Sequence, residues 1–295
     1  MDPGIFERVF PRPTLGESLD ALSAYGLTAV QFDPSSAGLP NVSDSGPISD
    51  ENPYVLGAER VRQEFVSRGI DIAAVSGTFN IIHPDSTIVR TGLQRLRQLA
   101  AACPALGTAI ITLSTGTCDA ANMWRHHPDN QSEASWNAAV RSMVEIATIG
   151  DEFQVTMAFE PEVNNVVDSA QRARRILDEI GSPWIKIVMD GANIFHTGEL
   201  PRMAEILDEA FDLLGSDIVL AHGKDLDHDG DAGQLPAGQG LLDYDRYLGL
   251  LSQSGYSGPL ILHGLTEQQV GGCVTFIQAR LTSLRNIVQF PVSLG

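Results

Sequence analysis

Four apolar runs in the second half of the chain each end in a carboxylate or an imidazole. They read Val155-Thr-Met-Ala-Phe-Glu160, Ile185-Lys-Ile-Val-Met-Asp190, Ile218-Val-Leu-Ala-His222 and Pro259-Leu-Ile-Leu-His263. Short, continuous apolar runs of this kind are typical of strands that are buried on both faces. Each run therefore predicts a buried strand with one chemically active side chain at its carboxyl end.

Helix signals alternate with strand signals along the whole chain. The expected helices are 14–25, 54–68, 87–103, 135–149, 169–180, 200–214, 244–253 and 267–286, and the further expected strands are 4–10, 29–32, 70–75 and 109–113. Regular alternation predicts a parallel sheet with its helices outside. No Gly-x-Gly-x-x-Gly motif follows the first strand, which disfavours an open dinucleotide-binding sheet. We therefore expect a closed (β/α)8 TIM barrel that forms one domain over residues 1–295.

Local signals support these boundaries and add three long loops. Thr14 with Glu17 three residues later predicts a capping box at the start of the first helix. Residues 33–53, 118–134 and 223–242 are polar or rich in glycine and proline, and they are expected to be loops. Loops of this length in a compact domain are often functional. Trp124 in the second loop is a candidate cover for a pocket.

Composition excludes several classes of function. The 295 residues are 43% hydrophobic, and 37 acidic against 19 basic residues give a formal net charge of −18. Such an acidic chain repels nucleic acid and anionic membranes, so neither is an expected partner. Cys103, Cys118 and Cys273 form no CxxC pair, which argues against a disulfide framework. With no signal-peptide pattern and no apolar run of about 20 residues, the expected location is cytoplasmic.

The four strand ends predict a metal site. In a barrel, residues at the carboxyl ends of neighbouring strands converge on one mouth. Glu160, Asp190, His222 and His263 would then offer carboxylate oxygen and imidazole nitrogen to one divalent ion. This donor set suits manganese, zinc, cobalt or iron, and magnesium less well.

The second half of the chain resembles a known superfamily. Phe159-Glu160-Pro161, Met189-Asp190-Gly-Ala-Asn193, His222-Gly-Lys224-Asp225 and Gly255-Tyr-Ser-Gly258-Pro-Leu-Ile-Leu262 resemble, in order and spacing, motifs of the xylose-isomerase-like TIM barrels. The branch that matches is the sugar phosphate isomerase/epimerase family. The resemblance covers roughly residues 70–280, while residues 1–68 match only in their βα alternation.

The resemblance implies a metal-dependent isomerase or epimerase. Its substrate would be a small sugar or polyhydroxy carbonyl compound, and the reaction a proton transfer through an enediolate. Glu160 would be ligand and principal base, Asp190 and His222 ligands, and His263 a ligand or partner acid. The candidate substrate contacts are Lys224 and Asn193, which belong to the matching motifs, and His196, which could line the mouth after the Asp190 strand or simply stand at the entry of the next helix.

One position departs from the family pattern. The family usually ends its last motif with a glutamate that serves as metal ligand and second acid/base, and here that residue is His263. Histidine can ligate a metal and move protons near neutral pH, but it does not reproduce the two-glutamate arrangement of the epimerases. Glu267 is expected on the final helix and is a poor replacement. Glu162 is a possible spare carboxylate, although it follows the strand end and could simply face solvent.

Alternative functions remain open on the same residues. A dehydratase or lyase of this fold needs one base and one acid, and a non-catalytic sugar-binding relative would tolerate the altered fourth position. An abasic-site endonuclease is disfavoured, because Asn193 stands where that chemistry has a histidine. The lack of a glycine-rich phosphate cradle favours an unphosphorylated substrate. The apolar segment 287–292 could pack on the barrel or on a second copy, so a homo-oligomer is one alternative.

Overall fold

The computed structural model describes the backbone of residues 1–289 and the side chains of residues 1–285. All side chains of the apolar segment 287–292, which was expected to pack on the barrel or on a second copy, therefore lie outside the described residues.

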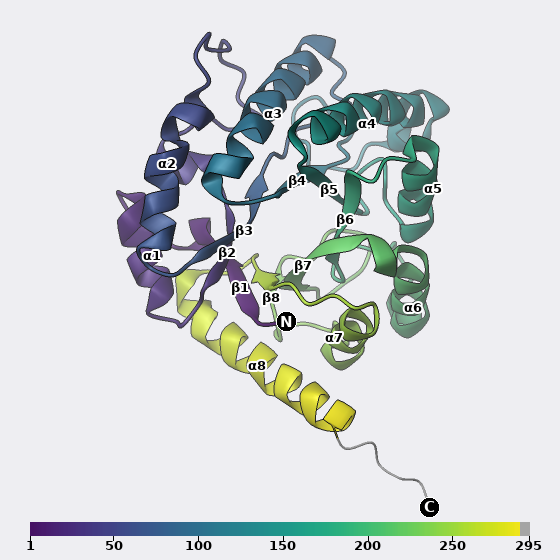
Figure 1. The fold of residues 1–295 in the computed structure, drawn as a ribbon. Coiled ribbons are helices and arrows are strands. Elements are labelled where there is room, and N and C mark those ends of the chain that lie inside the picture. The colour runs from purple at the N-terminus through teal and green to yellow at the C-terminus, as the bar shows by residue number, and fades with distance from the viewer. Residues whose placement is uncertain (290–295) are drawn as a thin grey trace, which may run out of the picture.

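Eight parallel strands form a closed barrel at the centre of the molecule (Figure 1). They are β1 (Pro3–Phe6), β2 (Ala29–Phe32), β3 (Asp71–Ser76), β4 (Ile110–Ser114), β5 (Thr156–Glu160), β6 (Ile185–Asp190), β7 (Ile218–Asp225) and β9 (Leu260–Leu262). Each of β1 to β7 pairs with the next along the chain, and β9 closes the ring between β7 and β1. This arrangement confirms the predicted (β/α)8 TIM barrel.

Eight helices surround the barrel (Figure 1). They are α1 (Leu15–Ser23), α2 (Pro53–Val66), α3 (Ser86–Leu106), α4 (Glu133–Phe153), α5 (Ala170–Ile180), α6 (Met203–Leu214), α7 (Tyr244–Gln253) and α8 (Glu267–Gln289). Short 3-10 turns lie at Glu7–Val9, Pro34–Ala37, Pro128–Gln131, Leu200–Arg202 and Gly215–Asp217. The predicted capping box is present, since the Thr14 side chain accepts from the Glu17 backbone and the Glu17 carboxylate accepts from the Thr14 backbone.

Two elements differ from expectation for physical reasons. The first strand was expected to reach Phe10, but β1 ends at Phe6 because the buried Glu7 carboxylate turns inward and accepts a hydrogen bond from the Asp33 backbone (2.8 Å). The strand that was expected to end at His222 continues to Asp225. Its extension pairs with the antiparallel strand β8 (Leu235–Pro236), which lies within the predicted loop 223–242.

Alternation along the strands separates an apolar layer from a polar one inside the barrel. Small and medium apolar side chains form a separate cluster made of Ala74, Ala158, Val188, Leu220 and Ile261. Because side chains two residues apart on a strand share a face, the next inward positions are Ser76, Glu160, Asp190, His222 and His263. The apolar layer therefore forms the floor on which the candidate site stands.

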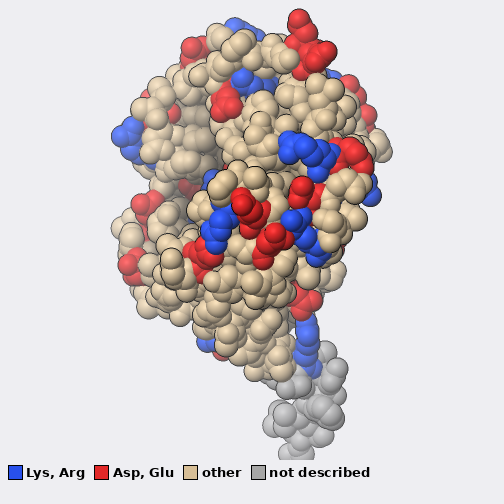
Figure 2. Space-filling model, turned by 90° about the vertical axis from the view of Figure 1, so that its left-hand side faces the viewer, with Lys and Arg blue, Asp and Glu red and all other residues tan. Residues whose placement is uncertain are grey.

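The outer surface carries interspersed charges. Figure 2, which faces the side of α1 and α2, shows acidic and basic side chains mixed over a largely uncharged face. On this side Arg68 of the α2–β3 loop pairs with Asp20 of α1 (2.6 Å) and with Glu64 of α2 (2.7 Å). Among the described residues, no helix combines the length and apolar character needed to cross a bilayer.

Packing of α3 against the β3–α3 loop predicts the effect of one added methyl group. A Cβ on Gly92 would lie 2.2 Å from Cδ2 of the buried Phe79 ring. We expect Gly92→Ala to lower the free energy of unfolding by about 1–3 kcal/mol through overpacking, measured by urea denaturation. Gly249→Ala in α7 is the matched control, because its Cβ would meet nothing within 4 Å. This control should be stabilising by about 0.5–1 kcal/mol, and equal effects of the two substitutions would contradict the packing argument.

Candidate active site

A cavity of about 650 Å³ opens at the carboxyl ends of the strands. Inward-facing strand residues, including Gln31, Glu160, His222 and His263, form its base. Its walls come from the β2–α2 loop, from Met123 and Trp124 of the β4–α4 loop, and from Asp231, Ala232 and Gln234 beyond β7. All three of the long predicted loops therefore contribute to the cavity.

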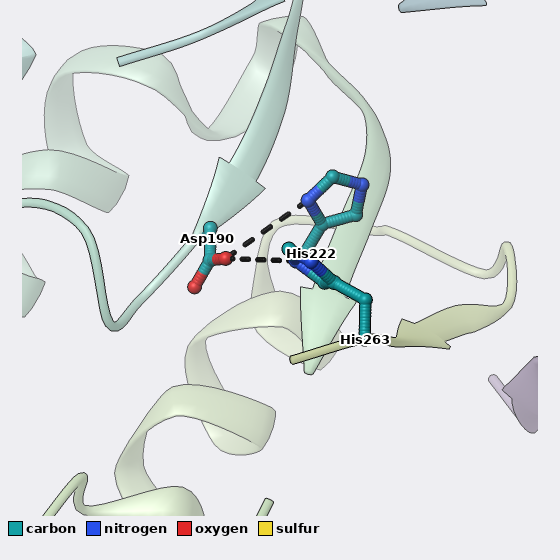
Figure 3. A group of neighbouring side chains, drawn as sticks. All are labelled: Asp190, His222 and His263. Atoms are coloured by element: carbon teal, nitrogen blue, oxygen red, sulfur yellow. Dashed lines mark hydrogen bonds and ion pairs between the residues drawn. The ribbon is translucent and has the colours of Figure 1, made fainter. Parts of the chain in front are cut away.

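Asp190, His222 and His263 lie together (Figure 3), with His222 and His263 lining the base of this cavity and the buried Asp190 in contact with them. Nε2 of His263 lies 3.3 Å from Oδ2 of Asp190, and Nδ1 of His222 lies 3.9 Å from the same oxygen. The two imidazole rings are 4.5 Å apart between centroids, with an angle of 67° between their planes. Each of the three residues offers one ligand atom, and these three atoms all lie within 4.8 Å of one another. The sequence-predicted convergence of these strand ends is therefore present.

Glu160 is next to this group. Its Oε2 lies 3.3 Å from Nδ1 of His222, while its Oε1 accepts a hydrogen bond from the Asn193 side chain. Asn193 in turn accepts from the backbone of Gly233 (3.0 Å), which ties the end of β6 to the loop beyond β7. Asn193 lines the cavity, but its main contacts fix the orientation of Glu160.

Lys224 places a positive charge beside the two carboxylates. Its side chain is buried, and Nζ lies 3.4 Å from Oδ2 of Asp190. Burial would raise the pKa of Asp190, but the Lys224 ammonium, the hydrogen bond with His263 and the facing His222 together outweigh burial and hold this pKa well below its ordinary value. For Glu160, too, burial is the largest effect and would raise the pKa, but the adjacent His222 and Lys224 together lower it below its ordinary value. Two ionised carboxylates against one ammonium leave one net negative charge.

His263 is kept neutral by its surroundings. Burial and then the nearby His222 lower the pKa of His263 from 6.5 to about 4. A neutral imidazole is the form that binds a metal ion.

The donor set fits a divalent metal ion. Nδ1 of His222 is buried and has no hydrogen-bond partner among the described residues, although it faces two carboxylates. Such an orphaned polar atom calls for a ligand or a proton. Two imidazole nitrogens with one or two carboxylate oxygens match the preferences of manganese, zinc, cobalt and iron. Asp190, His222 and His263, with Glu160 beside them, are the residues that would hold it.

The sequence left two alternatives open for Glu162, a spare carboxylate at the site or a residue that faces solvent. The side chain does not face solvent, because it is buried and lines the cavity. The segment after β5 folds back on itself and onto the end of β6, through hydrogen bonds from Glu162 N to Val167 O and from Val163 N to Asn193 O. Burial, and then the charge of Glu160, raise the pKa of Glu162 to about 8.

His196 lies away from the cavity lining. Its side chain is 42% exposed, and Nε2 lies 3.9 Å from the Asp168 carboxylate. The turn after β6 directs it outward, with its backbone N–H donating to the Glu199 carboxylate (2.8 Å). The sequence-based assignment of His196 to substrate binding therefore has no support in its position. Glu267 begins α8 and pairs with Arg12, as expected for a residue outside the site.

Gln31 is a site residue that the strand-end argument missed. It lines the cavity from the middle of β2, and its Oε1 lies 2.8 Å from Nε2 of His222. The available signal was a polar residue inside the apolar run Ala29-Val-Gln-Phe32.

Comparison with known proteins gives a consistent family match. A family model described as xylose isomerase-like TIM barrel matches residues 19–271. The L-ribulose-5-phosphate 3-epimerase UlaE of Shigella flexneri serotype 5b is 24% identical over 189 residues, which are 64% of this chain and 61% of that protein. The chain therefore spans about three fifths of the length of this relative.

Solved structures share the fold at low identity. A D-tagatose 3-epimerase-like protein superposes with a TM-score of 0.74 at 13% identity, covering 98% of this chain and 100% of that chain. The IolI protein, crystallised with a zinc atom, superposes with a TM-score of 0.70 at 15% identity, covering 96% and 98%. These likenesses show the shared barrel.

The low pKa of His263 predicts a pH dependence of stability in the metal-free protein. Between its ordinary pKa of 6.5 and about 4, the unfolded chain binds a proton on His263 that the folded chain does not. This contribution to stability is therefore present above about pH 6.5 and is lost as the pH falls toward 4. Between pH 7 and pH 5 the native protein should lose on the order of 1–2 kcal/mol more unfolding free energy than His263→Asn, measured by urea denaturation.

The control for this measurement is His196→Asn, which alters a histidine outside the cavity. It should retain the pH dependence of the native protein. An identical loss of stability in the native protein and in His263→Asn would contradict the buried, neutral state of His263.

Proposed function

The chain belongs to the xylose isomerase-like TIM barrel family, and we propose that it is a divalent-metal-dependent isomerase or epimerase of a small sugar or related polyhydroxy carbonyl compound. The observation that carries this proposal is the buried group of Asp190, His222 and His263 at the base of a polar cavity, with Nδ1 of His222 orphaned and Glu160 beside it. The epimerase name of the UlaE relative supports the same reaction class.

The proposed division of roles follows from the contacts. Asp190, His222 and His263, with Glu160, hold the metal, which when bound would polarise a substrate carbonyl and acidify the adjacent C–H. Glu160 removes the proton, because it is ionised and its carboxylate is held in place by Asn193. Lys224 contacts substrate oxygens, since it lines the cavity. His263 serves as ligand or partner acid.

Glu162 supplies the cavity with a second glutamate in place of the one that the family pattern has at position 263. The last family motif ends in His263 here, which removed one of the two glutamates that the resemblance implies for an epimerase. The cavity nevertheless contains a second glutamate, Glu162, from the segment after β5. Two carboxyl groups therefore remain available to substrate hydroxyls, which favours an isomerase or epimerase over a one-base dehydratase.

The substrate we propose is unphosphorylated. Arg8 and Lys224 are the two basic side chains that line the described cavity, and both already face carboxylates, Asp33 at 3.7 Å and Asp190 at 3.4 Å. The same lining contains four carboxyl groups, from Asp33, Glu160, Glu162 and Asp231, of which burial drives Glu162 toward its neutral form. Apart from the proposed metal ion, the lining thus carries three carboxylates against two cations and repels a phosphate dianion, whereas hydroxyl groups would find acceptors.

Solvent deuterium exchange tests the reaction class. In D2O, with one divalent ion per chain verified by elemental analysis, we expect the native protein to exchange deuterium into a ketose or inosose from a screened panel. Glu160→Gln should slow this exchange by about 100-fold to 10,000-fold, because it removes the base. The control Glu267→Gln, which breaks the ion pair with Arg12 outside the barrel, should retain the native rate.

Other outcomes of this experiment separate the competing functions. Net loss of water from the substrate would instead identify a dehydratase. Sugar binding without exchange or water loss would identify a non-catalytic relative. A native protein that takes up no metal after incubation with manganese, zinc or cobalt would refute the metalloenzyme.

Paired substrates test the charge argument. We expect kcat/KM for a ketose to exceed that for its terminal phosphate ester by at least about tenfold, which corresponds to about 1.4 kcal/mol of differential transition-state binding. The measurement is steady-state kinetics at low ionic strength, where repulsion is least screened. A preference for the phosphate ester would overturn the proposal of an unphosphorylated substrate while leaving the reaction class intact.

A further inference from the structure

Gln31 crosses the interior of the barrel from β2 to the metal-ligand candidates. Its side chain is buried, with a relative exposure of 3% for the residue. Oε1 lies 2.8 Å from Nε2 of His222 on β7, a strand that is separated from β2 by β1 and β9 in the ring. A polar side chain buried in this position, in an otherwise apolar strand, needs partners for both its donor and its acceptor atoms.

Two hydroxyl groups hold the other end of the amide. Nε2 of Gln31 donates to Oγ of Ser76 on β3 (3.1 Å) and to Oγ1 of Thr112 on β4 (2.9 Å). Both amide hydrogens are therefore used, and the carbonyl oxygen is the atom that faces His222. Since a carbonyl oxygen can only accept, Nε2 of His222 must be the donor in this hydrogen bond.

This hydrogen bond at Nε2 also determines the protonation of Nδ1, the other ring nitrogen of His222. With the proton held on Nε2, a neutral His222 presents its lone pair on Nδ1, the atom that lies 3.3 Å from Glu160 and 3.9 Å from Asp190. This is also the buried nitrogen that has no hydrogen-bond partner among the described residues. Hydrogen bonds at the distal nitrogen of a ligating histidine are known to fix its tautomer and orientation.

We propose that Gln31 is a positioning residue that keeps the proton on Nε2 of His222 and thereby makes Nδ1 the metal-binding nitrogen. The inference rests on the proposed metal-dependent function and assigns one further residue to that site. The reverse orientation of the amide would direct an N–H at Nε2 of His222. That would move the ring proton to Nδ1, where it would face Glu160 and block metal binding. The orientation of the Gln31 amide therefore determines which ring nitrogen of His222 is available to a metal ion.

Nitrogen NMR of the imidazole tests this directly. In metal-free and in zinc-loaded protein labelled with 15N-histidine, we expect Nε2 of His222 to show the protonated, pyrrole-type shift, assigned by comparison with His222→Asn. Gln31→Glu should retain this pattern, because a carboxylate also accepts from Nε2. Gln31→Leu should lose it in the metal-free protein, since nothing then holds the proton on Nε2.

Zinc affinity gives a second readout, measured by competition with a chromophoric chelator. Gln31→Leu should weaken zinc binding by about 10-fold to 100-fold, the usual effect of removing a partner of a metal-ligating histidine, and Gln31→Glu should bind zinc at least as tightly as the native protein. The matched control is Gln234→Leu, because Gln234 lines the same cavity but donates to the backbone of Ala232 instead of to a ligand candidate. It should leave zinc affinity unchanged.

Two results would overturn the proposal. The first is a Gln31→Leu protein with native zinc affinity and a native His222 spectrum. The second is a native protein whose His222 proton is on Nδ1. If Gln31→Leu fails to fold, the spectrum of the native protein and of Gln31→Glu still decides the question. Failure of the native protein to bind zinc, manganese or cobalt would instead refute the proposed function, and the metal-free spectrum would still report on Gln31.

Discussion

Side chains on a strand alternate between two faces, and in a closed parallel barrel this period of two sets both the packing of the interior and the contents of the mouth. In this protein, closure depends on the pairings of β9 with β1 and β7. Ala158, Val188, Leu220 and Ile261 fill the interior below, and the next inward residue on each of these strands is Glu160, Asp190, His222 or His263. A shift of one residue in any of these strands would exchange a chemically active side chain for an outward-facing apolar one.

Burying this many ionisable groups is costly unless their charges are compensated. Here the Lys224 ammonium lies beside the Asp190 carboxylate, and the Asn193 side chain donates a hydrogen bond to the Glu160 carboxylate. Burial raises the pKa of Glu162 and lowers that of His263, so both groups are driven toward their neutral forms. The pKa values of Asp190 and Glu160 are held below their ordinary values by the polar groups around them, so both stay ionised. The site thus contains both ionised and neutral groups within one cavity, an arrangement that suits proton transfer.

The loops complete the site through contacts between segments that are distant in sequence. Asn164 donates to the backbone of Trp124 (3.2 Å) and to the Asp231 carboxylate, which joins the β4–α4 loop to the loop beyond β7. Asn193 connects Glu160 to Gly233 in a similar way. These side-chain amides tie the walls of the cavity to its base, and Trp124, which is 52% exposed, forms part of the rim. An apolar rim of this kind helps to exclude water from a reacting centre.

The sequence alone determined the barrel and the strand-end residues. Alternating apolar runs and amphipathic segments are local patterns, and in a parallel barrel the carboxyl ends of all strands point the same way. Glu160, Asp190, His222 and His263 could therefore be placed at one mouth without coordinates. Local patterns do not determine the direction of a loop side chain. The burial of Glu162 follows from a fold-back onto β6, and the outward position of His196 follows from the turn after it.

Only the tertiary structure could bring Gln31 to His222. The two residues are separated by 191 positions, and their contact exists because barrel closure sets β2 and β7 across one interior. From the sequence, Gln31 was one polar residue in a short apolar strand. In the folded chain its amide meets Ser76 and Thr112 on one side and an imidazole on the other. The strand pattern thus decides which groups reach the mouth, and the packing across the barrel decides how their hydrogen-bonding atoms are oriented.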